Sequence, residues 1–256
     1  MSVRRATGAL ESEASETMRE FNPARTAERA TTQLQLTAVR GSEMIVPRLR
    51  GVSHAAAFCL AVVAAVVLVC LAPAGRATVA MAIYGAALAA LFGGSALYHR
   101  WPGPPRFKPV LQRIDHSTIF VFIAASYTPI ALMVLRGPLA WVILGIAWLG
   151  AAAGVAFSLG WIHAPRVVRA GSYLTLGWLA VIAIPQLLGE LGAAPLVLLG
   201  AGGVLYSVGA IIYASQRPDP WPLTFGFHEI FHALVIAAAA AQYTAVIGWV
   251  LPAAHA

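Results

Sequence analysis

Residues 52–72 read VSHAAAFCLAVVAAVVLVCLA, an apolar run that contains no Asp, Glu, Lys or Arg. A helix of about 20 such residues is long enough to cross the hydrocarbon core of a bilayer. The rest of the chain agrees, since 59% of its residues are hydrophobic, only 11% are charged, and the mean hydropathy is +0.76. Soluble domains carry roughly 25% charged residues. The sequence therefore predicts an integral membrane protein.

Six further apolar stretches follow this first one. They cover residues 77–98, 115–135, 138–159, 170–189, 194–214 and 226–251. Each stretch is continuously apolar instead of alternating, which argues against the strands of a membrane barrel. Glycine and alanine are frequent in them, as at Gly93, Gly94 and residues 151–153, and small residues allow helices to pack closely in lipid. We expect an all-α bundle of seven transmembrane helices.

The acidic residues divide the chain into two parts. Six of the ten precede residue 46, and beyond it only Asp115, Glu190, Asp219 and Glu229 remain. We expect a polar cytoplasmic N-terminal arm over residues 1–45, with no apolar periodicity to order it, and a membrane domain over residues 46–256. Two cysteines, Cys59 and Cys70, lie in the first apolar run and are expected to be small buried side chains.

The basic residues predict how the chain is oriented. With the seven spans above, fifteen of the 17 Lys and Arg residues fall on one side, and Arg76 and Arg136 fall on the other. Because positively charged loops stay in the cytoplasm, the N-terminus is predicted inside and the C-terminus outside. This orientation also accounts for the net charge of +7, so no nucleic-acid partner is expected. We expect a multi-pass protein of the plasma membrane. Because the composition is rich in Arg and Ala, we expect this to be a bacterial inner membrane.

Polar side chains gather at one depth of the predicted bundle. On this topology, four separate spans place ionisable or hydroxyl groups at the level of the inner leaflet: His54, Ser95, His99, Asp115, His116, His228, Glu229 and His232. Ionisable groups inside spans are costly and are usually functional. Unrelated core histidines would not be expected to share a level, so we expect a site there.

The motif His228-Glu229-Ile230-Phe231-His232 is the strongest element of this site. Residues four apart share one face of a helix, so both imidazoles can bind the same metal ion. A catalytic zinc ion needs three protein ligands and an open position. His99 is the natural candidate for the third ligand.

The same residues are also compatible with purely structural roles. His228 and His232 could be structural histidines bonded to backbone carbonyls, and Asp115 could pair with Arg113 or Arg100 at the interface. His54 could have no role beyond capping the first helix. His116 lies about 100° around a helix from Asp115 and need not face the same cavity.

Four stretches of the sequence resemble one known family. They are residues 47–54 (PRLRGVSH), 95–99 (SALYH), 113–120 (RIDHSTIF) with 125–130 (ASYTPI), and 226–232 (GFHEIFH). In this order, and over roughly residues 46–251, the chain resembles the hemolysin III branch of the progestin and adipoQ receptor family. It departs from the family at Pro47 and Arg50, where many relatives carry Glu and Asn, and at Ala125, where Gly is usual.

The resemblance implies a seven-helix fold with a zinc ion at its inner-leaflet end. Its ligands would be His99, His228 and His232, while Asp115 would hold the water at the zinc with Ser95 close by. The family belongs to a wider group of predicted membrane metal-hydrolases, and its eukaryotic receptor branch is associated with hydrolysis of ceramide amide bonds.

Three functions compete for this site. The preferred hypothesis is zinc-dependent hydrolysis of an amide or ester in a membrane lipid, with Asp115 and Ser95 as catalytic residues. An intramembrane metalloprotease would instead use Glu229 as its base and Asp115 as a ligand. A hemolysin-like pore or receptor-like protein would hold a structural zinc, but a pore predicts a polar stripe along a span, and spans 4 to 6 show none.

Overall fold

The computed structural model describes residues 47–255, and the structure below concerns that range. The arm expected over residues 1–45 lies outside the described residues, so the division into an arm and a membrane domain stays a prediction. Within residues 47–255 the chain is helical, and an isolated bridge between Trp221 and Phe225 is its sole β-type pairing.

The helices follow the apolar stretches closely. They are α3 (Val52–Leu71), α4 (Arg76–Arg100), α5 (Lys108–Met133), α6 (Pro138–Gly160), α7 (Arg166–Gly177), α8 (Ile184–Leu191), α9 (Ala193–Ser215) and α10 (Phe227–Ala245). A 3-10 segment, η2 (Trp178–Ala183), joins α7 to α8, and a π-helical turn, η3 (Val246–Val250), extends α10. Seven helical segments in the described range are long and apolar enough to cross a membrane, with α7, η2 and α8 together forming the fifth. The predicted seven-helix fold is confirmed.

Two spans begin at least four residues before their predicted starts, while the other starts agree to within one residue. The third begins at Lys108 instead of residue 115, because Pro109 in its first turn suits a helix start and the basic side chains there can extend to the interface. The fifth begins at Arg166 instead of residue 170 and changes to 3-10 geometry before α8. Pro185 accounts for that break, since proline lacks the N–H that a continuous α-helix needs.

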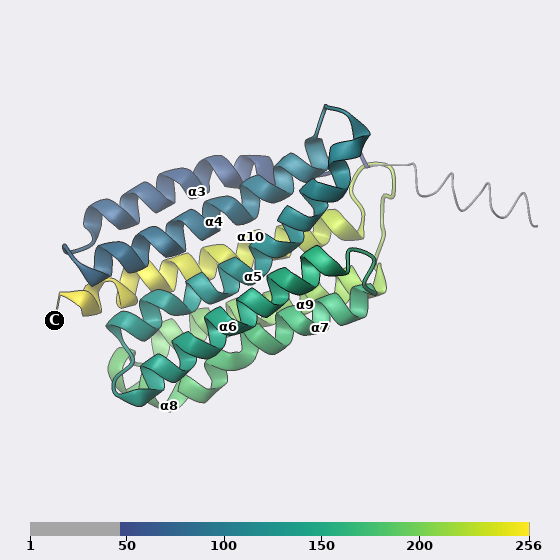
Figure 1. Cartoon of the computed structure of the whole chain (residues 1–256). Coiled ribbons are helices and arrows are strands. Elements are labelled where there is room, and N and C mark those ends of the chain that lie inside the picture. The colour runs from purple at the N-terminus through teal and green to yellow at the C-terminus, as the bar shows by residue number, and fades with distance from the viewer. Residues whose placement is uncertain (1–46, 256) are drawn as a thin grey trace, which may run out of the picture. The chain divides into compact units, whose positions relative to one another are not determined.

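Helix α5 lies in the middle of the bundle (Figure 1). Its contacts are most extensive with α4 and α6, while α3 packs on α4 and α9 packs on α10. Two apolar clusters meet across α5: Phe122 and Ala125 belong to one, and Phe120 and Ala124 belong to the other. The helix that carries Asp115 is therefore fixed from two sides.

Small residues bring the helices together, as the sequence predicts. A Cβ on Gly85 of α4 would lie 2.6 Å from the Cβ of Ala65 on α3, and Ala151 of α6 is buried. The expectation for the cysteines is wrong, because Cys59 and Cys70 are both exposed. Helix α3 lies at the edge of the bundle (Figure 1), so most of its apolar side chains face the membrane instead of the core.

Candidate metal centre

Three imidazoles meet at one end of the bundle. His99 comes from the last turn of α4, and His228 and His232 come from the first turns of α10. One ring nitrogen from each lies within 4.8 Å of the others, and Nε2 of His99 is 3.1 Å from Nε2 of His228. Two imidazole nitrogens bound to one tetrahedral zinc ion, each at about 2.0–2.1 Å, would be roughly 3.3 Å apart. The donor set and its spacing fit a metal ion.

The backbone-carbonyl partners that a structural role would use are not found for the two α10 histidines among the described residues. Among residues 47–255, neither the His228 nor the His232 side chain donates a hydrogen bond to a backbone carbonyl. His232 is 1% exposed, and its Nδ1 has no partner within that range. A structural imidazole at that depth would be expected to satisfy both nitrogens.

The first turn of α10 is fixed by two carboxylates. Oδ1 of Asp219 accepts from the Phe227 N–H at 3.0 Å, and Oε2 of Glu229 accepts from the Gly226 N–H at 2.8 Å. The other carboxylate oxygen of Glu229 forms an ion pair with Nε of Arg50 at 2.6 Å. The two carboxylate bonds to backbone N–H groups stabilise the helix start that presents His228. Both carboxylate oxygens of Glu229 are therefore engaged, and Glu229 does not line the cavity described below.

The segment before α3 packs against the same end of the bundle. Arg48 and Leu49 donate backbone hydrogen bonds to the carbonyls of Leu223 and Thr224, at 3.1 and 3.3 Å. Gly51 has φ of 74°, and a Cβ placed on it would lie 2.7 Å from the Cβ of His99. Glycine is therefore needed there, both for the backbone and to make room for His99.

Asp115 and Ser95 line the same cavity as His228 and His232. Both are buried, at 9% and 3% exposure. The pairing of Asp115 with Arg113 or Arg100 does not occur within the described chain, since Arg113 donates instead to the carbonyl of Leu159 at 3.0 Å. The structure thus brings the three histidines together and places Ser95 and Asp115 on the cavity that His228 and His232 also line, while the roles of all five stay predictions.

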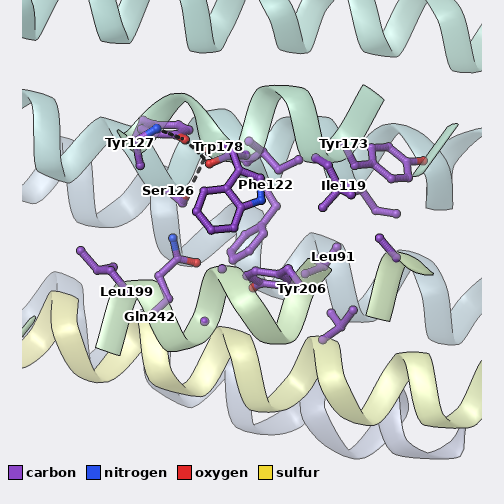
Figure 2. Close-up of a pocket in the computed structure, with 18 of the residues that line it drawn as sticks. Leu91, Ile119, Phe122, Ser126, Tyr127, Tyr173, Trp178, Leu199, Tyr206 and Gln242 are labelled. Carbon is purple, nitrogen blue, oxygen red and sulfur yellow. Dashed lines mark hydrogen bonds between the residues drawn. The ribbon is translucent and has the colours of Figure 1, made fainter. Parts of the chain in front are cut away.

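A cavity of about 280 Å³ leads away from these residues into the bundle. His54, Ser95, Asp115, His228 and His232 line its polar end, and the remainder is largely aliphatic and aromatic (Figure 2). Part of its wall comes from η2 and the start of α8, where Trp178, Val181 and Ile184 are 46%, 48% and 44% exposed. These residues both line the cavity and are exposed on the outside of the bundle, so this wall is one residue thick there.

A family model described as haemolysin-III related matches residues 43–243. The chain belongs to the haemolysin-III related family. It is 37% identical to "Hemolysin-3" of Bacillus cereus over 70% of this chain and 78% of the relative. It is 35% identical to "Hemolysin-3 homolog" of Bacillus subtilis (strain 168), over 66% and 76%, and 31% identical to human "Monocyte to macrophage differentiation factor", over 64% and 67%. The resemblance to the hemolysin III branch is confirmed, and the protein is a multi-pass membrane protein.

Two further histidines of this haemolysin-III related protein also belong to the site. His54 is 3% exposed and stacks on His232, with ring centroids 3.7 Å apart and planes at 14°. It does not merely cap α3. His116 lines the same cavity as Asp115, although the two are neighbours on a helix.

One buried charge near the cavity was not predicted. Arg169 is 4% exposed and donates to the hydroxyl of Tyr213, a cavity-lining residue, at 3.2 Å and to the Ile162 carbonyl at 2.9 Å. Hydropathy places it in a loop, because the apolar stretch of the fifth span begins only at residue 170. One feature of the sequence could have indicated that Arg169 belongs to a helix: Arg166 and Arg169 are three residues apart, about one helical turn.

Proposed function

We propose that this haemolysin-III related protein is a zinc-dependent hydrolase that cleaves an amide or ester bond of a membrane lipid. The observation that carries the proposal is the cluster of three histidine nitrogens, two of which belong to residues that line an otherwise apolar cavity together with Asp115 and Ser95. A lipid places its carbonyl groups below the headgroups and its chains deeper, which matches this arrangement.

The histidines His99, His228 and His232 would hold the metal. Three imidazoles without a carboxylate or thiolate are a usual donor set for catalytic zinc. Bound there, zinc would supply a Lewis acid that polarises a carbonyl and eases the deprotonation of water. The stacked ring of His54 holds His232 in place and limits its rotation.

Asp115 and Ser95 supply the proton handling. The Asp115 carboxylate, which lines the cavity, would orient the attacking water and accept its proton. The Ser95 hydroxyl also lies in the cavity wall, where it can donate to the oxygen on which negative charge develops. The apolar remainder of the cavity would take the lipid chain and exclude bulk water.

Metal content of the detergent-purified protein is the first test. We expect about one zinc per chain in the wild type, and its loss in His99→Ala and in the His228→Ala/His232→Ala double variant. A wild-type protein that carries no metal and takes up none from added zinc would contradict the proposal.

Asp115→Asn separates metal binding from turnover. The amide cannot accept the proton, so hydrolysis of the lipid amides and esters that the wild type cleaves should fall by about 10²–10⁴-fold. Zinc content should stay at the wild-type level, because Asp115 is not one of the three ligands. Full activity in this variant would remove Asp115 from the mechanism.

Glu229→Gln distinguishes this hydrolase from an intramembrane metalloprotease. Glu229 is engaged by Arg50 and by the Gly226 N–H, so turnover should persist, whereas a protease that uses Glu229 as its base would lose it. The variant should lose stability by about 3 kcal/mol, because Arg50 is left without its partner. The matched variant Glu190→Gln, in an exposed pair with Arg136, should lose less than about 1 kcal/mol.

A further inference from the structure

The cavity has a second polar level, far from the histidines. Ser126 of α5, Tyr206 of α9 and Gln242 of α10 all line it, among aliphatic and aromatic neighbours. Figure 2 shows the three side chains, from three helices, around the same part of the cavity. No step of the proposed hydrolysis uses them.

Two helices independently give the depth of this level. Gln242 follows His232 by ten residues on α10, which corresponds to about 15 Å along the helix axis. Ser126 follows Asp115 by eleven residues on α5, or about 16 Å. The second level therefore lies near the middle of a hydrocarbon core that is about 30 Å thick.

The polar groups at this level have hydrogen-bonding capacity to spare. Oε1 of Gln242 and the hydroxyl of Tyr206 are buried and have no partner among residues 47–255. The Ser126 hydroxyl donates to the Ile123 carbonyl at 2.7 Å and keeps its lone pairs free. Unpaired polar groups are costly in an apolar surrounding, so an occupant that pairs with them would be favoured.

Two other polar side chains that line the cavity, by contrast, are already paired. The Tyr127 hydroxyl accepts from the Ala180 N–H at 2.9 Å and donates to the Gly177 carbonyl. The indole N–H of Trp178 donates to the Ser207 hydroxyl at 3.0 Å. At this level of the cavity wall, Oε1 of Gln242 and the Tyr206 hydroxyl are the side-chain groups left without a partner among residues 47–255; the buried Tyr84 hydroxyl is also unpaired, but Tyr84 does not line the cavity.

We propose that this level binds a hydroxyl group carried on the lipid chain, about 15 Å from the histidines. A hydroxyl can donate to Oε1 of Gln242 and at the same time accept from the Tyr206 hydroxyl. An unsubstituted chain would leave both unpaired. The inference rests on the proposed function for the identity of the site as a lipid site, and it specifies the substrate as an acyl lipid hydroxylated near mid-chain.

Binding of three acids tests this, because an acid is what the proposed hydrolysis releases. The zinc-loaded full chain is titrated in detergent, by calorimetry, with octadecanoic acid, 12-hydroxyoctadecanoic acid and 2-hydroxyoctadecanoic acid. We expect the 12-hydroxy acid to bind about tenfold more tightly than the unsubstituted acid, and the 2-hydroxy acid to gain no such advantage. A purely apolar cavity predicts the opposite sign, since burying an unpaired hydroxyl weakens binding.

Two variants locate the effect. Gln242→Leu and Tyr206→Phe should each abolish the preference for the 12-hydroxy acid while leaving zinc content and binding of octadecanoic acid at wild-type level. Gln186→Leu is the matched control, since Gln186 is also buried in part but does not line the cavity, and it should keep the preference. If Gln242→Leu fails to fold, the preference measured in Tyr206→Phe still tests the proposal.

Equal or weaker binding of the 12-hydroxy acid, or a preference that survives both variants, would overturn the proposal. So would a zinc-loaded protein that binds none of the three acids. A protein that shows the preference yet hydrolyses nothing would refute the hydrolase and leave the hydroxyl site standing, so the two failures are distinguishable.

Discussion

At the scale of single residues, the metal centre depends on one glycine outside it. Gly51 precedes α3 with φ of 74° and packs directly on His99. The adjacent Arg50 pairs with Glu229, one residue after His228. A short segment before the first span therefore holds ligands from both α4 and α10, although it supplies no ligand itself.

Gly51→Ala should weaken the metal centre. The new Cβ would lie 2.7 Å from the Cβ of His99, so the imidazole must shift, and zinc affinity should fall by about tenfold or more. Competition with a zinc-binding dye measures it. Gly137→Ala is the control, because Gly137 also has a positive φ of 65° but no atom within 4 Å of its Cβ position. Equal losses of zinc affinity in both variants would mean that backbone strain, not contact with His99, is responsible.

At the scale of elements, α3 and α4 approach each other at a contact that admits no side chain. Gly85 faces Ala65, whose Cβ and Cα lie 2.6 and 2.8 Å from the position of an added Cβ. Apolar surfaces gain nothing by leaving lipid, so such contacts depend on close packing between backbones. Because α3 also carries His54, its position on α4 affects the site.

Gly85→Leu should separate the two helices. Overpacking of this kind costs about 1–3 kcal/mol or more, and it should lower the melting temperature in detergent. Gly145→Leu, on α6 with no atom within 4 Å of its Cβ position, should melt close to the wild type. If both variants melt like the wild type, α3 is not held at this contact.

At the scale of the whole molecule, orientation decides which leaflet the cavity serves. The distribution of Arg and Lys predicts that the histidine end faces the cytoplasm, so the lipid would come from the inner leaflet. Two exposed loop residues report on the two sides: Ala74, between α3 and α4, and His163, between α6 and α7.

Labelling of single cysteines in intact cells checks this orientation. In a background with Cys59→Ala and Cys70→Ala, a membrane-impermeant maleimide should label Ala74→Cys and should label His163→Cys after lysis only. The reverse pattern would place the histidines in the outer leaflet. The chemistry proposed for the site would be unchanged, but its substrate would come from the other side.

The sequence by itself determined the helices and the level of the site. Uninterrupted apolar runs of about 20 residues predict spans whatever surrounds them, and a spacing of four residues puts His228 and His232 on one helix face. The positions of Ser95, His99 and Asp115 near span ends predict a shared depth. The motifs in four spans were also enough to indicate the family.

Only the tertiary structure decided how each helix is rotated and which polar groups meet. In spans that are apolar on all sides, hydropathy does not distinguish the face that points inward from the one that faces lipid. For that reason the exposure of Cys59, the stacking of His54 on His232, the burial of Arg169 and the meeting of Tyr206 with Gln242 at one cavity could not be predicted. They follow from contacts between residues far apart in the chain, which packing alone brings together.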